Sequence, residues 1–161
     1  MLPGGREATF DILRHPGAAA ILPVDGQGRL LLIRQYRHAL GREIWEIPAG
    51  TLEVGEAPLA CARRELVEEA GVDAAEFIDL GAFAPLAATS DEIIHLFLAR
   101  DLSPAQQNLD PDEVISEVRA MPLAELAADV ADGSLIDPKA MVAWLRAAAL
   151  GYLPGPGKTQ P

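Results

Sequence analysis

Residues 50–72 read GTLEVGEAPLACARRELVEEAGV, and this stretch decides the fold. Pro58 suits the first turn of a helix, where its missing N–H is not needed, and Gly71 suits the left-handed residue that ends one. Between them apolar residues recur at helical spacing, namely Leu59, Ala62, Leu66 and Ala70. The pattern predicts a helix over 58–70, preceded by a glycine-rich acidic loop from Thr51 to Ala57.

Short apolar or alternating runs on both sides of this helix predict β-strands. They cover Thr9 to Leu13, Ala18 to Val24, Leu30 to Gln35, Ile44 to Ile47, Phe77 to Phe83, Ile93 to Ala99 and Val114 to Met121. Asp25-Gly26 favours a turn, so we expect the second and third strands to form a hairpin. Two more helices are expected, at Leu123 to Val130 and at Pro138 to Leu150, the latter with Asp137 as N-cap. This order predicts an α/β or α+β fold, with a mixed sheet covered by helices.

The 161 residues, 50% of them hydrophobic, fit one domain, expected over 1–153, with a disordered tail over 154–161. No apolar run approaches the roughly 20 residues that cross a bilayer, and residues 1–6 lack the order of a signal peptide. Cys61 is the only cysteine, which excludes an internal disulfide. We expect a cytoplasmic protein with no membrane partner.

The formal net charge of −11 opposes binding to long nucleic acid, so no nucleic-acid partner is expected. A small polyphosphate ligand is still compatible with this charge. Divalent cations held by clustered carboxylates would invert the local sign of the field.

Three glutamates share one arc of the predicted helix, because Glu65, Glu68 and Glu69 stand at i, i+3 and i+4. Like charges at this spacing destabilise a helix by roughly 0.2–0.5 kcal/mol per pair, a cost that a hard divalent cation would reverse. The alternative is a solvated acidic face partly neutralised by Arg63 and Arg64. On the helix alone the two interpretations stay open.

The wider pattern resembles the signature of the Nudix family, G-x5-E-x7-R-E-U-x-E-E-x-G-U, in which U is a bulky aliphatic residue. All nine specified positions are met, by Gly50, Glu56, Arg64, Glu65, Leu66, Glu68, Glu69, Gly71 and Val72. The resemblance implies a Nudix-type α/β/α sandwich and a hydrolase that uses Mg²⁺, with Mn²⁺ as a substitute.

The same resemblance assigns roles within the catalytic centre. Glu65 and Glu69 are the main metal ligands, Glu68 is a further or water-mediated ligand, and the carbonyl of Ala49 is a backbone ligand. Gly50 lets the backbone come close to the metal. Arg64, within the same catalytic set, forms an ion pair with Glu56 that supports the loop rather than the chemistry.

Three stretches outside the signature resemble the ADP-ribose pyrophosphatase branch: 34–37 (RQYR), 45–50 (WEIPAG) and 90–99 (SDEIIHLFLA). They predict substrate contacts from Arg34, Arg37, Trp45, Glu46 and Glu92. The alternatives are that Trp45 and Tyr36 belong to the core and that an arginine simply pairs with Glu43 or Glu46. The branch places its catalytic base in a late acidic loop, which is 110–113 (DPDE) here. Glu113 is the expected base, with Asp112 as the alternative and an acidic solvent-exposed turn as the third interpretation.

One departure from the branch concerns the substrate: Ala87 stands where the branch has a proline. We expect ADP-ribose to be hydrolysed to AMP and ribose 5-phosphate, and GDP-mannose, other nucleotide sugars and FAD stay open. A dNTP-cleaning enzyme and a non-catalytic ligand sensor are the rival classes; the arginine pair and the complete set of carboxylates disfavour them. A homodimer is expected, because exposed sheet edges need covering.

Overall fold

The computed structural model describes residues 3–109, 111 and 113–157. Its strands are β1 (Ala18–Pro23), β2 (Leu30–Arg37), β3 (Arg42–Glu46), β4 (Ala49–Thr51), β5 (Val72–Phe83), β6 (Ile94–Pro104) and β7 (Ile115–Met121). Its helices are α1 (Pro58–Ala70), α2 (Leu123–Asp132) and α3 (Pro138–Ala149). No helix among the described residues combines the length and apolarity that crossing a membrane requires.

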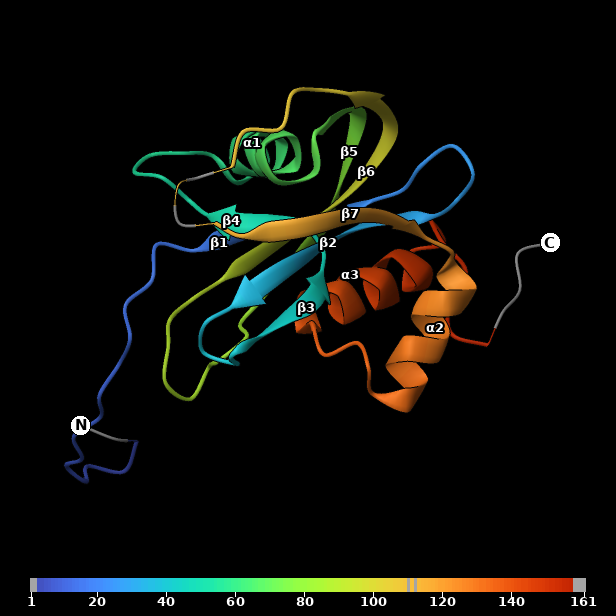
Figure 1. The fold of residues 1–161 in the computed structure, drawn as a ribbon. Helices are drawn as coiled ribbons and strands as arrows, with labels where there is room; N and C mark the ends of the chain where they lie inside the picture. The colour runs from blue at the N-terminus through green and yellow to red at the C-terminus, as the bar shows by residue number, and fades with distance from the viewer. Residues whose placement is uncertain (1–2, 110, 112, 158–161) are drawn as a thin grey trace.

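The strands divide between two sheets, in the orders β4-β1-β6-β5 and β3-β2-β7. The four-stranded sheet is mixed, because β1 runs parallel to β6 and antiparallel to β4. Helix α1 lies on one side of the strands, and α2 and α3 lie on the other (Figure 1). The expected fold of helices on both faces of a mixed sheet is confirmed.

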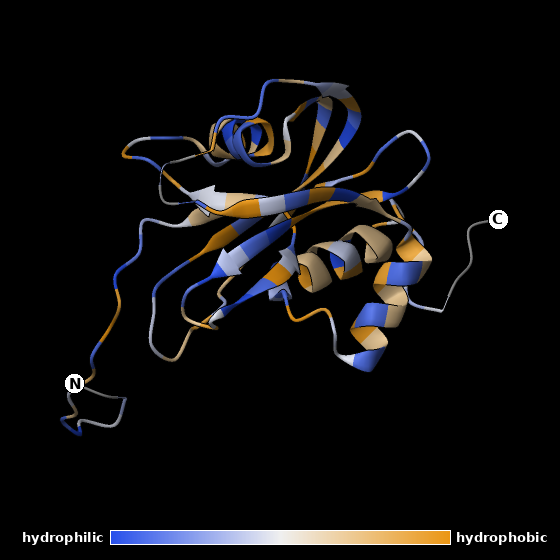
Figure 2. Ribbon diagram, viewed as in Figure 1, coloured by the Kyte–Doolittle hydropathy of each residue, from blue (hydrophilic) through white to orange (hydrophobic). Residues whose placement is uncertain are grey.

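Strand β1 lies at the centre and supplies side chains to two apolar cores. Ala18, Ala20 and Leu22 join the core that includes α3, whereas Ala19 and Ile21 join the core beneath α1. A strand buried on both faces must be apolar at every position, so β1 reads as a continuous apolar run. Figure 2 shows the complementary pattern: the turn between β1 and β2 is hydrophilic, while apolar residues gather in the strands and in α3.

The predicted hairpin of residues 18–24 and 30–35 is wrong. The turn itself is present, but only one bridge, Val24 to Leu30, joins its two arms, and β1 and β2 enter different sheets. Both edges of β1 are already hydrogen-bonded, to β4 and to β6. Since a strand has only two edges, β2 must pair elsewhere, and it lies between β3 and β7.

The predicted strand Thr9 to Leu13 is also absent from the described chain. Within it only Leu13 forms a bridge, to Ser90, and the side chains of Phe10 and Leu13 are about two-thirds exposed. Residues 49–51 form β4 against β1, although they lie outside every predicted strand and Thr51 begins the predicted loop. Local patterning missed β4 because its pairing partner lies some thirty residues earlier in the chain.

The helices agree with the sequence-based expectations. Gly71 ends α1 in the left-handed conformation, with φ of 66°, and Asp137 caps α3 by accepting hydrogen bonds from the backbone N–H groups of Lys139 and Ala140. Leu59 departs from the predicted apolar stripe of α1, since it is 48% exposed. At the end of the chain, the carbonyl of Pro154 accepts a hydrogen bond from Trp144, while 158–161 lie outside the described residues.

Candidate active site

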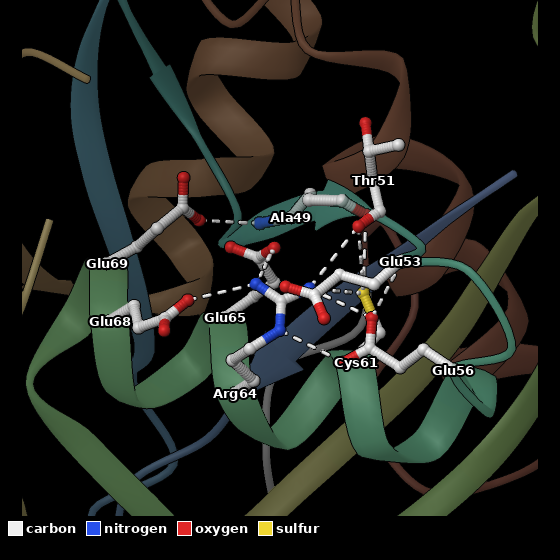
Figure 3. Close-up of polar contacts among 10 residues, drawn as sticks. Ala49, Thr51, Glu53, Glu56, Cys61, Arg64, Glu65, Glu68 and Glu69 are labelled. Atoms are coloured by element: carbon white, nitrogen blue, oxygen red, sulfur yellow. Dashed lines mark hydrogen bonds and ion pairs between the residues drawn. The ribbon is translucent and has the colours of Figure 1, made fainter. Parts of the chain in front are cut away.

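Strand β4 and helix α1 face each other and form the base of the site (Figure 3). The backbone N–H of Ala49 donates a hydrogen bond of 2.7 Å to the Oε2 atom of Glu69. A Cβ atom at Gly50 would overlap the carboxylate of Glu65. Glycine at position 50 therefore allows β4 to approach the carboxylates of α1.

Three carboxylates meet at this point: ligand atoms of Glu65, Glu69 and Glu113 all lie within 4.8 Å of one another. Glu65 and Glu69 come from successive turns of α1, and Glu113 comes from the segment that precedes β7. Glu65 is 6% exposed and Glu69 is 0% exposed. The predicted alternative base, Asp112, lies outside the described residues.

Burial raises the pKa values of two of these carboxyl groups. The pKa of Glu65 is raised to about 7, first by burial and then by the charges of Glu113 and Glu68, although Arg64 opposes the shift. The pKa of Glu69 is raised well above its ordinary value by burial, despite the hydrogen bond from Ala49. The Oε1 atom of Glu69 is buried and has no hydrogen-bond partner among the described residues. Glu69 therefore brings a buried, unsatisfied acceptor to the cluster.

The side chain of Arg64 contacts three glutamates of the site, Glu56, Glu65 and Glu68 (Figure 3). Its Nε and Nη2 atoms each donate a hydrogen bond of 3.0 Å to Glu56, so the predicted ion pair is present and bidentate. These hydrogen bonds lower the pKa of Glu56 to about 2. The Nη1 atom also contacts Glu65 at 2.6 Å and Glu68 at 2.9 Å. Glu68 thus pairs with Arg64, and it does not belong to the three-carboxylate cluster of the described chain.

A cleft of about 400 Å³ opens beside the carboxylates. Its described lining residues come from β2, β4, α1 and the loops around them: Gln35, Tyr36, Arg37, His38, Ala49, Gly50, Thr51, Glu53, Arg64, Glu65 and Glu113. A larger cleft, of about 460 Å³, lies beside α2 and α3, and its only charged residue within the described chain is Arg29. The described residues that line this second cleft include no carboxylate or imidazole that could activate water, so the first cleft is the candidate active site.

Of the five predicted substrate contacts, only Arg37 lines the cleft; the described lining residues do not include Arg34, Trp45, Glu46 or Glu92. Arg37 forms two hydrogen bonds of 2.6 Å with Glu46, and Arg34 pairs with Glu43 at 3.2 Å. Both arginines therefore have carboxylate partners, as the alternative interpretation allowed.

The two other predicted contacts lie elsewhere on the protein. Trp45 packs against the core that includes α3, and Arg34 and Arg119 each lie 5.9 Å from its ring centroid. The carboxylate of Glu92 lies 3.6 Å from the imidazole of His15.

Two residues of this region were missed from the sequence. Lys139 of α3 lies 2.8 Å from Glu46 and 2.9 Å from Asp137, and no sequence pattern indicates the pair with Glu46, which is 93 residues away. Gln35 lines the cleft although it is 5% exposed. A polar residue at a buried position of an alternating strand was the available signal for Gln35.

The donor set fits a hard divalent cation. Mg²⁺ prefers carboxylate and carbonyl oxygens, and Glu65, Glu69 and Glu113 offer carboxylate oxygens close together. The unpartnered Oε1 atom of Glu69 is a lone-pair donor that a cation would satisfy. The geometry of the described residues is therefore compatible with a metal site.

The fold and the site define the class of protein. The NUDIX domain model matches residues 13–145, and the chain belongs to this family. The predicted resemblance is thus confirmed, and with it an enzyme of the Nudix hydrolase type.

Within the family, the ADP-ribose pyrophosphatase of Bacillus subtilis (strain 168) is 40% identical over 140 residues, covering 86% of this chain and 75% of the relative. The methanol dehydrogenase activator of Bacillus methanolicus is 37% identical, covering 88% and 77%. The ADP-ribose pyrophosphatase of Mycobacterium tuberculosis (strain ATCC 25618 / H37Rv) is 36% identical, covering 84% and 67%. A crystal structure of an ADP compounds hydrolase has a TM-score of 0.70 at 23% identity, covering 85% of this chain and 75% of that one. This last likeness shows the fold.

Proposed function

We propose that this Nudix hydrolase cleaves the pyrophosphate bond of nucleoside diphosphate derivatives in the presence of Mg²⁺, and that ADP-ribose is its main substrate. The observation that carries the proposal is the cluster of Glu65, Glu69 and Glu113 beside the cleft. Clustered carboxylate oxygens suit a substrate that arrives with a divalent metal. The identities to ADP-ribose pyrophosphatases support the choice of substrate.

Glu65 and Glu69 are the proposed metal ligands, with the carbonyl of Ala49 beside them. Bound Mg²⁺ would neutralise diphosphate oxygens and lower the pKa of an attacking water. The protein holds its ligands in place through the Ala49–Glu69 hydrogen bond and the Arg64–Glu65 ion pair. Glu68, which pairs with Arg64, is a further ligand only through a water or after a change of rotamer.

Glu113 is the proposed general base. Its carboxylate oxygen would accept the proton of the attacking water, a role that requires a group within hydrogen-bond reach of that water, and Glu113 lies beside the proposed metal ligands. Arg64 and Glu56 support the loop that ends at α1, since their bidentate pair joins that loop to the helix. Arg37 contributes positive charge to the cleft wall for the diphosphate.

The rest of the proposal concerns location and assembly. We propose a cytoplasmic homodimer, in which a second copy covers the exposed apolar side chains of Phe10, Ile12 and Leu13. Arg34, Trp45, Glu46 and Glu92 do not face the cleft within one chain. Their proposed role in substrate binding therefore depends on that second copy or on movement around the cleft.

A substrate panel tests this function. Wild-type protein is assayed with ADP-ribose, GDP-mannose, FAD and dNTPs, with Mg²⁺, with Mn²⁺ and with excess chelator. ADP-ribose should give the highest kcat/KM, with AMP and ribose 5-phosphate as products, and chelator should abolish turnover. A preference for dNTPs with release of pyrophosphate would contradict the substrate, and full activity in chelator would contradict the metal.

The base is tested separately with Glu113→Gln. This change should lower kcat by about 10²- to 10⁴-fold, the range typical of a lost general base, and leave Mn²⁺ affinity nearly intact. A parallel loss of Mn²⁺ affinity would make Glu113 a metal ligand instead. An unchanged kcat would exclude both roles.

A further inference from the structure

Gln35 lies where β2 passes from the core to the cleft. Leu31 and Ile33 on the same face of this strand pack into the apolar core beneath α1. The next residue on that face is Gln35, which is 5% exposed and lines the cleft with Glu65 and Glu113. The pairing of β2 with β7 shifts register between Arg34 and Gln35. An apolar residue would suit this position if it served packing alone.

The side-chain carbonyl of Gln35 is an unsatisfied acceptor. Its Oε1 atom is buried and has no hydrogen-bond partner in the part of the chain that the structure describes. Besides Oε1 of Glu69, it is the only such buried side-chain atom among those residues. Gln107 provides a contrast, because its Nε2 atom donates a hydrogen bond of 2.6 Å to the carbonyl of Glu69. A buried acceptor without a donor lowers the stability of the free protein, so the position indicates a ligand.

The chemistry of the acceptor limits what that ligand group can be. Phosphate oxygens of a nucleoside diphosphate are themselves acceptors and cannot donate to Oε1. The groups that can donate are the amino group of the base, the sugar hydroxyls of the substrate and water molecules held by the metal. Gln35 lines the cleft beside Glu65 and Glu113, and the donors next to a diphosphate held there are O–H groups, because a sugar separates the base from the diphosphate.

We propose that Gln35 is a ligand-binding residue whose carbonyl oxygen accepts a hydrogen bond from an O–H group in the loaded cleft. This inference rests on the proposed function for the nature of the ligand. It assigns to β2 a polar contact to the ligand, in addition to the charge of Arg37 two residues further along the same strand.

The test uses Gln35→Met, which keeps the length of the side chain and removes the acceptor. Two probes are titrated by calorimetry: Mn²⁺ alone, and α,β-methylene ADP-ribose in the presence of Mn²⁺. The melting temperature of the free protein is measured as well. Removal of the unsatisfied acceptor should leave the melting temperature unchanged or raise it, by about 2–4 °C. The analogue should bind about 3- to 10-fold more weakly, the loss typical of one hydrogen bond.

The two probes distinguish the source of the O–H group. A weaker affinity for Mn²⁺ alone assigns the group to metal-bound water, whereas unchanged Mn²⁺ affinity with weaker analogue binding assigns it to a sugar hydroxyl. Unchanged affinity for both probes overturns the proposal. A lower melting temperature in both Gln35→Met and Gln35→Leu also overturns it, because the amide would then have a partner in the free protein.

Two other glutamines serve as matched controls. Gln107→Met removes a satisfied hydrogen bond and should lower the melting temperature. Gln27→Met, at an exposed turn beside the second cleft, should change neither stability nor affinity. If wild-type protein fails to bind the analogue, the proposed substrate is contradicted, and the Mn²⁺ titration and melting temperature still decide whether Gln35 is a binding residue.

Discussion

Glu69 and Glu46 are both buried carboxylates, 0% and 1% exposed, yet the protein neutralises only one of them. Glu46 is held by Arg37 at 2.6 Å and by Lys139 at 2.8 Å. Burial favours a high pKa for Glu46, but these two cations outweigh burial and lower it. Glu69 has one backbone hydrogen bond and an unpartnered Oε1 atom, and burial raises its pKa.

The difference separates a structural charge network from a ligand site. The network of Arg37, Glu46, Lys139 and Asp137 contains two cations and two anions, and it ties β2 and β3 to the start of α3. The cluster of Glu65, Glu69 and Glu113 contains three carboxyl groups, of which Glu65 contacts Arg64. A buried group that lacks a counter-ion is costly unless a ligand supplies one. The buried Oε1 atom of Glu69, which has no hydrogen-bond partner among the described residues, is therefore the feature that supports the proposed cation site.

The largest expected effect comes from breaking the structural network with Lys139→Met. Glu46 and Asp137 would each lose a cation, and removal of one partner of a buried pair typically destabilises a protein by about 3–5 kcal/mol. Urea unfolding measures the change. Arg14→Met is the matched control, because Arg14 pairs with Asp91 at the surface, where solvent screens the two charges, and its loss should change stability far less. Equal effects of the two changes would show that the network is not structural.

The converse change at the cluster is Glu69→Gln, which removes the charge and keeps the size. It should lower kcat by on the order of 10²-fold or more, because a metal ligand is lost. It should not lower, and is expected to raise, the melting temperature of the metal-free protein, since a buried group without a counter-ion disappears. Normal activity, or a marked loss of stability without metal, would place Glu69 among the structural residues.

The raised pKa of Glu65 predicts that the free energy of unfolding of the metal-free protein depends on pH. The pKa of Glu65 is about 7 in the folded state, against 4.5 for an ordinary glutamate, so the folded state binds more protons than the unfolded state between these values. Its stabilising contribution is present below pH 4.5 and is lost as pH rises through 7. The free energy of unfolding should therefore fall between about pH 5 and pH 8.

Glu65→Gln is the control for this dependence, and it should flatten the pH profile of the metal-free protein. Saturating Mg²⁺ should also reduce the fall, because the cation replaces the protons. Glu56, with a pKa of about 2, acts in the other direction, since its contribution is present above pH 4.5 and is lost on acidification through 2. An identical fall in wild type and Glu65→Gln would exclude Glu65 as its source.

The smallest effect is expected at Arg34, which pairs with Glu43 at 3.2 Å and does not line the described cleft. Arg34→Ala should leave KM and kcat nearly unchanged, because Arg34 is outside the described lining of the cleft and its partner is Glu43. Arg37→Ala should raise KM more, since Arg37 lines the cleft. A larger effect at Arg34 than at Arg37 would show that a second copy of the chain brings Arg34 to the substrate.

Much of the site could be predicted from local spacing. The turn of a helix brings Glu65 and Glu69 together, and the ion pair between Arg64 and Glu56 joins a helix to the loop just before it. The spacing of the glutamates does not predict that Glu68 pairs with Arg64. Nor does it predict that Glu65 and Glu69 lie beside Glu113. That division depends on burial, which is set by strands that precede and follow the helix.

The sequence by itself determined the helix from Pro58 to Ala70, its left-handed end at Gly71 and the signature that identifies the family. These features depend on interactions between neighbours in the chain, whose distances are fixed by helical geometry. The tertiary structure alone decided that β1 and β2 enter different sheets, that Lys139 neutralises Glu46, and that Gln35 reaches the cleft. The division of strands between the sheets depends on which strand edges are still free to pair. The Lys139–Glu46 pair and the position of Gln35 depend on which polar groups the folded chain buries next to one another. The hydrophobic periodicity of the sequence does not predict these long-range contacts.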